Sequence, residues 1–228
     1  MKVAQTPPTT TDHSESIPGA PLESILCTSE LDRRPSRPAD TRAERAALDH
    51  LTQRLAESPR NILQALADTI LAALRCDSAG VSLVNEDRSR FYWPAIAGVW
   101  RPHIAGGTPR NFGPCGDVLE HDCPLLFRHF ERRYTYFMPV TPPCNECLLV
   151  PFYVGGEAVG TIWAITHDAP HHDNSRVRSS GPGASKPGCF DREDLRLLQS
   201  LGGFASGAYE AWISLVPPAQ RPGEKRPG

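Results

Sequence analysis

The residues with the greatest potential for chemistry are cysteines in two short motifs. Cys115 lies in a Gly-Pro-Cys-Gly sequence at 113–116, and Cys144 and Cys147 form a C-x-x-C pair. The first turn of a helix has unpaired backbone N–H groups and the positive end of the helix dipole, which together lower the pKa of a thiol. Cys115 can therefore be a reactive thiol, part of a ligand pocket, or a small buried packing residue, the commonest state of a free cysteine.

The pair formed by Cys144 and Cys147 is a weak zinc signal, because a structural zinc site needs four ligands at suitable spacing. Cys115, His121 and Cys123 can complete such a set only if the fold brings them together. No parallel βαβ pattern surrounds the pair, which argues against a thioredoxin-like redox motif. We expect two incidental thiols at the start of a strand and no metal site.

A second group of potential metal ligands lies in a polar segment near residue 170. Its members are His167, Asp168, His171, His172 and Asp173. A metal site needs ligands that a second shell of residues holds in place, and nearness in sequence does not supply that shell. We therefore expect these side chains to be solvated.

A basic and aromatic segment offers a different chemistry. Its members are Arg128, His129, Arg132, Arg133, Tyr134 and Tyr136. Arginine matches the geometry of phosphate and carboxylate groups, so this segment could face an anionic ligand. A solvated lid surface is the alternative, and we favour it.

The overall composition excludes several classes of partner. The chain has 228 residues and a formal net charge of −2, so we expect no bulk attraction to nucleic acid or to an anionic membrane. No run reaches the roughly 18 apolar residues of a membrane span. Residues 1–16 contain no apolar core of a secretory signal. Seven irregularly spaced cysteines indicate free thiols, so we expect a cytoplasmic protein.

Composition also predicts the domain organisation. Residues 1–40 are rich in Pro, Thr and Ser, and we expect them to be disordered, although an interaction peptide within 22–31 is the alternative. A single domain should span 41–215 and contain a flexible insertion at 169–189. The Pro-rich segment 216–228 should be a disordered tail.

The element that organises this domain is an apolar hairpin. Two strand-length runs, Leu148–Val154 and Ala158–Thr166, are joined by Gly155 and Gly156, which tolerate the positive φ of a two-residue turn. Both runs are apolar on both faces, which indicates interior strands covered by helices on one side and by a pocket on the other. Pro151 removes a ladder donor and predicts a local edge or bulge.

Helices and further strands should surround this hairpin. A helix should begin near Asp40 or Thr41, where Thr41 and Glu44 have the spacing of a capping box, and a second helix should follow Ser58. A last helix begins at Asp191. Strands are predicted at 79–84 and 90–97, and a short helix should follow the Gly-Pro-Cys-Gly motif. Four residues of the second strand should share one face: Phe91, Trp93, Ala95 and Ala97.

Four segments of the chain resemble the GAF domain family. They are RCDSAGVSL at 75–83, GPCGDVLE at 113–120, the hairpin at 148–168, and FDREDLRLLQSLGGFASGAYE at 190–210. The resemblance extends over roughly residues 42–213. It implies an α+β, GAF/PAS-like antiparallel sheet of about six strands, with terminal helices packed on one face and a ligand pocket on the other. Domains of this family are mostly regulatory modules that bind small molecules and often dimerise through their terminal helices.

The resemblance implies a non-catalytic, small-molecule-binding sensor or regulatory domain in signal transduction. It would act as a homodimer or on a histidine kinase or another signalling partner, and neither its ligand nor any cofactor is identified by the sequence. Our candidate ligand-binding residues come from the segments expected on the pocket side: Phe91, Trp93, Cys115, Tyr134, Tyr136, Phe152 and Trp163.

The alternative function is enzymatic. A catalytic branch of the GAF family reduces free methionine sulfoxide with a cysteine in a V-C-G turn and a second cysteine ahead of the hairpin. Cys115 matches the first, and Cys144 or Cys147 lies near the second. That branch holds the substrate amine with an acidic residue in the second hairpin strand, where this chain has Trp163. The sequence also lacks the Cys-His dipeptide of bilin-binding relatives and the N-K-F-D-E motif of cyclic-nucleotide-binding relatives.

Overall fold

The computed structural model describes residues 19–74, 76–168 and 189–217. Six strands form one sheet in the order β3-β2-β1-β6-β5-β4, and all neighbouring strands are antiparallel. The strands are β1 Ser78–Val84, β2 Arg90–Gly98, β3 Gly107–Pro109, β4 Leu125–Arg128, β5 Cys144–Val154 and β6 Glu157–His167. The helices are α1 Glu30–Arg33, α2 Thr41–Glu57, α3 Ile62–Ala73, α4 Pro114–His121 and α5 Arg192–Leu215. The predicted α+β class with about six strands is confirmed.

The central hairpin is formed by β5 and β6, as the sequence predicts. Gly155 and Gly156 have φ angles of 60° and 78° and connect the two strands in a two-residue turn. Such positive φ angles at both turn positions are what glycine accommodates without strain. Pro151 pairs with β6 but lies beyond Leu149, the last residue of β5 that pairs with β4. This part of β5 is therefore a local edge, as the proline indicates.

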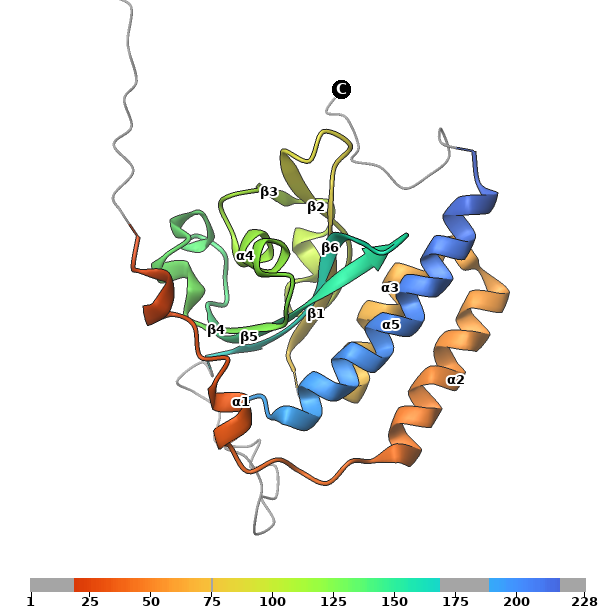
Figure 1. Ribbon diagram of the computed structural model, residues 1–228, viewed down its shortest axis with the longest axis horizontal. Coiled ribbons are helices and arrows are strands. Elements are labelled where there is room, and N and C mark those ends of the chain that lie inside the picture. The colour runs from red at the N-terminus through yellow and green to blue at the C-terminus, as the bar shows by residue number, and fades with distance from the viewer. Residues whose placement is uncertain (1–18, 75, 169–188, 218–228) are drawn as a thin grey trace, which may run out of the picture.

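Helices α3 and α5 cover one face of the sheet, and α2 packs against both of them. Figure 1 shows α2, α3 and α5 side by side on this face, while α4 lies on the opposite face. Val81, Leu148 and Ile162 point from three neighbouring strands into the helical layer, where they join one apolar core with Leu66 and Leu201. Burial of each such side chain contributes roughly 1.5–3 kcal/mol. The helical layer therefore anchors the sheet from one side.

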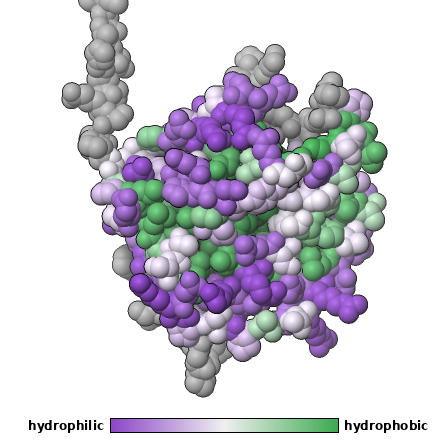
Figure 2. Space-filling model, viewed as in Figure 1, coloured by the Kyte–Doolittle hydropathy of each residue, from purple (hydrophilic) through white to green (hydrophobic). Residues whose placement is uncertain are grey.

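The C-terminal end of α5 extends past this core. Figure 2 shows apolar residues in a broken band across the middle of the visible face and at this end of α5. Leu215 is 84% exposed there. The outward face of the helical layer therefore keeps apolar surface at one end.

A bulge in β2 overturns one prediction. Phe91 and Trp93 pack into the α4-side cluster, whereas Ala95 and Ala97 belong to the helix-side core. The four residues do not share a face, because the register between β1 and β2 shifts after Val81. An extra residue in one strand reverses the side to which the following side chains point.

The N-terminal segment is ordered from residue 19 onward, which corrects the expected disorder of 1–40 over residues 19–40. Ile25 and Leu31 are buried, and Leu26 forms an antiparallel bridge with Phe127 of β4. Two backbone hydrogen bonds flank that bridge, from Cys27 N to the Leu126 carbonyl and from Arg128 N to the Ile25 carbonyl. The segment thus covers the β4 edge of the sheet. The predictions for residues 1–18, 169–188 and 218–228 lie outside the described residues.

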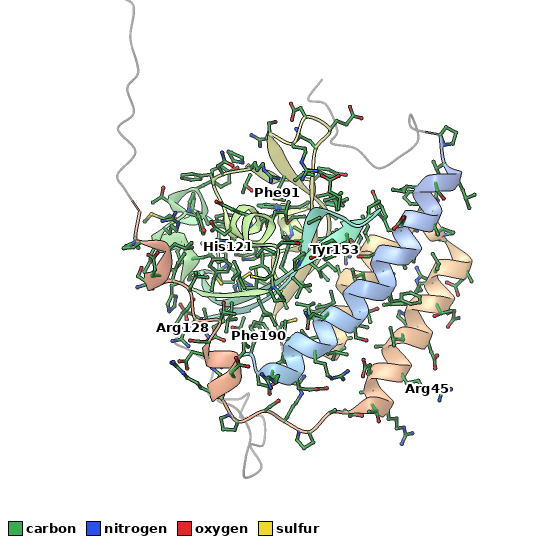
Figure 3. All side chains as sticks on the ribbon, viewed as in Figure 1. Arg45, Phe91, His121, Arg128, Tyr153 and Phe190 are labelled. Atoms are coloured by element: carbon green, nitrogen blue, oxygen red, sulfur yellow. The ribbon has the colours of Figure 1, made fainter. Side chains whose placement is uncertain are left out.

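A buried carboxylate fastens this segment to the domain. Glu146 of β5 is fully buried and accepts hydrogen bonds from both Nη atoms of Arg34, at 2.9 and 2.7 Å. Arg128 Nη2 and the Phe190 backbone N–H donate at 2.7 and 3.0 Å. Arg128 and Phe190 lie near α1 in Figure 3. Burial alone would raise the pKa of Glu146, but the two guanidinium groups and the N–H hold it below its usual value.

The helix caps confirm one sequence prediction and correct another. Asp191 caps α5, and Asp194 completes a capping box. α2 begins at Thr41, but its cap is Asp40, whose side chain accepts a hydrogen bond from Ala43 N. The predicted capping box between Thr41 and Glu44 is therefore wrong. After Ser58, the 3₁₀ turn η2 (Pro59–Asn61) leads directly into α3.

Candidate functional site

A cavity lies on the α4 side of the sheet. Its empty volume is about 320 Å³, part of which is open to solvent. The lining residues come from β1, β2, β5, β6, α4 and the irregular segments between them: Ser82, Trp93, Trp100, Pro114, Cys115, Phe130, Phe137, Cys147, Leu149, Trp163 and Ile165. Concave, mostly apolar sites with few polar groups are typical of small-molecule pockets.

Five of the eleven residues that line the cavity are aromatic. Trp100 lies at the centre of the group, 6.4 Å from Phe137 in a nearly parallel arrangement and 6.2 Å from Trp163 in an edge contact. Phe130 packs edge-on against Trp100 at 6.3 Å. Trp93 stacks on Phe137 at 6.1 Å. Such contacts hold the rings in a fixed arrangement and leave narrow apolar spaces between them.

Small residues on β1 make room for these rings. Strand alternation directs Ser78, Gly80 and Ser82 toward the cavity side, while Ala79 and Val81 face the helices. A Cβ at Gly80 would lie 2.3 Å from the Trp163 ring, closer than van der Waals contact allows. Glycine is therefore required at this position of β1 for the tryptophan to occupy its place.

The polar atoms in the cavity bond with one another. Thr161 Oγ1 donates to the sulfur of Cys115 at 3.1 Å, and the Cys115 thiol donates to Ser82 Oγ at 3.4 Å. The indole N–H of Trp163 also donates to Ser82 Oγ, at 3.0 Å. This network orients Cys115 and Trp163 and satisfies their buried polar groups.

The thiol of Cys115 is in a neutral form. Burial raises its pKa to about 11, and the hydrogen bonds with Ser82 and Thr161 offset only part of that effect. The residue lies in the first turn of α4, so the expected lowering of the thiol pKa by the helix is outweighed by burial. Cys144 is buried as well, and its pKa is raised by burial and by its contact with Cys147.

The described residues contain no group of three or more His, Cys, Asp or Glu side chains that could hold a metal ion. His167 instead hydrogen-bonds through Nε2 with Ser78 Oγ at 2.9 Å and through Nδ1 with the Pro143 carbonyl at 3.1 Å. Burial lowers the pKa of His167. The other histidines and the aspartate of the predicted polar cluster, His171, His172 and Asp173, lie outside the described residues.

Three of the seven predicted site residues line the cavity: Trp93, Cys115 and Trp163. Phe91 and Tyr134 are buried in the same aromatic cluster without lining it. The hydroxyl of Tyr134 donates to the carboxylate of Asp117 on α4, so this tyrosine fixes the helix that carries Cys115. Its role is to support the cavity wall.

The other two predicted residues lie elsewhere. Phe152 belongs to the helix-side core and contacts Tyr209 of α5 at 5.7 Å, so its expected placement on the pocket side is wrong. Tyr136 is 47% exposed, and its hydroxyl donates to the Gly107 carbonyl at 3.2 Å. The apolar character of β5 on both faces conceals which way Phe152 points, because it removes the alternating pattern.

Several lining residues were not predicted. The positions of Leu149 and Ile165 could have been inferred from Trp163. Leu149 pairs with Trp163 across the hairpin, and Ile165 lies two positions after Trp163 on the same face of β6. Trp100, Phe130 and Phe137 have no such signal, since they lie in segments without strand or helix periodicity. Only the folded chain brings these three rings together.

The predicted basic patch does not face the cavity. Arg128 binds Glu146, Arg132 Nη2 donates to the Ser24 carbonyl at 3.0 Å, and Arg133 Nη1 donates to the Ala20 carbonyl at 3.2 Å. These arginines hold the N-terminal segment against the domain. An anionic ligand for this patch is therefore not supported by the contacts.

A model of the GAF domain family matches residues 56–210, more than half of the chain. The protein belongs to the GAF domain family. The matched region contains the six strands, α3 and α4, and therefore the whole framework of the cavity. A comparison with curated proteins found no match. In the described part of this GAF domain protein, no helix combines the length and apolar character needed to cross a membrane.

Solved structures with the same fold have low sequence identity to this chain. The GAF domain of the Acinetobacter phosphoenolpyruvate-protein phosphotransferase has a TM-score of 0.56 at 14% identity, with 77% of this chain and 97% of that chain covered. The free methionine-R-sulfoxide reductase of Neisseria meningitidis, solved with its substrate, has a TM-score of 0.54 at 16% identity, covering 79% and 98%. Residues 122 to 287 of a methyl-accepting chemotaxis protein give 0.54 at 17% identity, covering 75% and 99%. These likenesses establish the fold alone.

Proposed function

We propose that this chain is a non-catalytic sensor or regulatory GAF domain that binds a small, mostly apolar molecule in the aromatic cavity. The observation that carries the proposal is the cavity wall itself, in which Trp93, Trp100 and Trp163 surround a space that a neutral thiol borders. Aromatic walls supply large apolar contact area and few polar groups, which suits an apolar ligand.

The state of the polar groups supports binding in preference to chemistry. Ser82, Cys115 and Thr161 satisfy one another, and the described lining residues include no carboxylate or histidine that could act as a base. A nucleophilic cysteine needs an electropositive, accessible environment that lowers its pKa. Cys115 is 7% exposed and its pKa is raised to about 11.

The sheet offers a route from the cavity to the helical layer. Trp163 faces the cavity, and its neighbour Ile162 faces α5 from the same strand. Ile162 lies so close to Gly202 of α5 that a Cβ there would be 2.7 Å from the Ile162 methyl group. A ligand that displaces Trp163 would shift β6 against α5 and so create a second packing of the sheet on the helix. If the ligand binds one packing more tightly than the other, its binding moves the equilibrium toward that packing.

We further propose that this output is read by a second copy of the chain or by a signalling partner at the helical layer. Leu51 of α2 is fully buried inside the domain, whereas Ala47, Leu48 and Leu55 of the same stripe are only partly buried. The exposed end of α5, with Leu215, remains the surface for such a contact. We propose the cytoplasm as the location, since all seven cysteines are free. Light scattering at micromolar concentration tests the dimer, and a monomer there contradicts it.

Thermal shift against a library of small apolar metabolites tests the binding proposal. A ligand at 100 times its Kd should stabilise the domain by about 2.7 kcal/mol. Trp93→Leu should abolish that stabilisation, whereas Trp212→Leu on the helical side should retain it. A library without any stabilising compound, or equal loss in both variants, would contradict a ligand site in this cavity.

A thiol-dependent reductase of free methionine sulfoxide is the second candidate. One observation favours it: Cys115 and Cys147 line the same cavity. The reductase of Neisseria meningitidis named above has the same fold. This function predicts NADPH consumption in the presence of thioredoxin and free methionine sulfoxide, and its loss in Cys115→Ser. Absence of turnover in the unmodified protein would exclude it.

A further inference from the structure

A second cavity adjoins the first and shares three of its rings. It has an empty volume of about 210 Å³ and is lined by Trp100, Phe130, Glu131, Phe137, Met138, Val140, Pro143 and Cys144. Because Trp100, Phe130 and Phe137 border both spaces, these rings form the partition between them. A ligand in the aromatic cavity can therefore extend into the second space if the partition shifts.

Glu131 is the one carboxylate among the described residues that line this second cavity. Its Oε2 atom is buried and has no hydrogen-bond partner among the described residues. Its Oε1 atom lies 3.6 Å from His129 Nδ1, and 20% of the side chain is exposed. A buried carboxylate oxygen without a donor is costly, because the group gives up its hydration without compensation.

The nearby arginines make their hydrogen bonds elsewhere, and the charge of Arg132 offsets only a small part of the cost of burying Glu131. Arg128 binds Glu146, and Arg132 and Arg133 donate to backbone carbonyls of the N-terminal segment. A second carboxylate, Asp168, lies 3.9 Å from the same Nδ1 atom of His129. Burial raises the pKa of Glu131, with a smaller contribution from Asp168, and its own backbone N–H, His129 and Arg132 offset only part of that effect. Among the described residues, no arginine or lysine lies within ion-pair distance of Glu131.

The three shared rings provide surfaces that attract a cation. Trp100 and Phe137 are nearly parallel, at an interplanar angle of 9°, and Phe130 is perpendicular to both, at 84° and 82°. Ring faces carry negative charge density, and recognition of ammonium groups by several aromatic walls is their established use in binding sites. A carboxylate beside such walls adds an ion pair in a poorly hydrated space.

We propose that Glu131 and the rings of Trp100, Phe130 and Phe137 form a subsite for the positively charged end of an organic amine. The apolar body of the same ligand occupies the aromatic cavity, so this inference rests on the proposed function and specifies its ligand class. The ammonium group supplies the hydrogen-bond donor and the charge that the buried Oε2 atom of Glu131 lacks.

The test compares 2-phenylethylamine with its uncharged counterpart 2-phenylethanol. Three of the four tryptophans line the aromatic cavity, so intrinsic fluorescence and calorimetry both report binding. The amine should bind at least about tenfold more tightly than the alcohol. Glu131→Gln should remove this preference and leave the affinity for the alcohol unchanged. The matched control Glu86→Gln, at an exposed turn, should leave both affinities unchanged.

The outcomes separate this subsite from the pocket. Equal binding of both compounds, unaffected by Glu131→Gln, would overturn the subsite while the aromatic pocket stands. Failure of both compounds to bind or to perturb the tryptophans would count against the subsite and the pocket together. Thermal unfolding provides a further check, since burial outweighs the attractive contacts of the Glu131 carboxylate, and Glu131→Gln should therefore not lower the Tm. A lower Tm would show that the carboxylate already has a structural partner.

Discussion

The salt bridge between Arg34 and Glu146 joins residues 112 positions apart and predicts a large effect of one substitution. Arg34→Ala removes two hydrogen bonds to a fully buried carboxylate and a third, at 2.7 Å, to the Phe190 carbonyl. The N-terminal segment then loses its main polar anchor. Glu146 keeps Arg128, the Phe190 N–H and the Cys189 thiol as partners.

The magnitude follows from the burial of the pair. Removal of one partner from a buried ion pair costs about 3–5 kcal/mol, because the other charge stays buried and uncompensated. The Arg34 side chain is 11% exposed and that of Glu146 is not exposed at all, so little solvent screening applies. Arg128 still binds Oε1, which places the expected loss near the lower limit, about 3 kcal/mol. For a domain of this size the corresponding decrease in Tm is about 6–12 °C.

Thermal unfolding and limited trypsin digestion are the assays. Arg34→Ala should lower the Tm by that amount and increase tryptic cleavage after Arg33, because the N-terminal segment detaches from the domain. Arg45→Ala is the matched control, since Arg45 is 85% exposed and lies 3.9 Å from its partner Asp49. Its free energy of unfolding should change by less than about 0.5 kcal/mol. Equal Tm values for the two variants would refute the anchoring role of Arg34.

Three further predictions concern the cavity, the sheet and the pH dependence. Cys115, whose pKa burial raises to about 11, should react with a thiol reagent at pH 8 roughly 100-fold more slowly than an exposed cysteine, and comparable labelling by mass spectrometry would contradict this. Gly80→Ala should destabilise the domain by about 1–3 kcal/mol and shift the Trp163 fluorescence, whereas Gly203→Ala, with open space around its Cβ, should raise the Tm. A higher Tm for Gly80→Ala than for Gly203→Ala would refute the close packing of Trp163 on Gly80. Burial raises the pKa of Glu146, but two arginines lower it further, so the folded-state pKa lies below the unfolded value near 4.5. The stability that ionised Glu146 contributes is therefore present above pH 4.5 and lost as the pH falls through the folded-state pKa. Glu146→Gln should therefore show a weaker loss of stability in acid, measured by denaturant titration, than the unmodified protein.

The sequence contains the information for the local elements of this fold. The two-glycine turn at 155–156, the aspartate cap of α5 and the apolar stripes of the helices depend on neighbours within a few residues, and all appear as expected. The family resemblance adds the sheet and the position of Cys115 beside the cavity. These features are readable because strand and helix periodicity reports directly on burial.

The remaining features depend on contacts between distant residues. The N-terminal segment is polar and proline-rich, and only its pairing with β4 and Glu146 explains its order. The aromatic partition from Trp100, Phe130 and Phe137 combines three irregular segments. The bulge in β2 reverses the side chains beyond Trp93, and although Pro94 is a local sign of it, the pairing with β1 decides which face each later side chain takes. Tertiary context decides each of these cases.

Native mass spectrometry of the freshly purified full chain tests the central claim most directly. A ligand site in the aromatic cavity predicts a population that retains a small molecule, which denaturation releases and which Trp93→Leu fails to retain. Uniform protein at the mass of the bare chain, combined with the absence of any thermal stabilisation by small molecules, would contradict it.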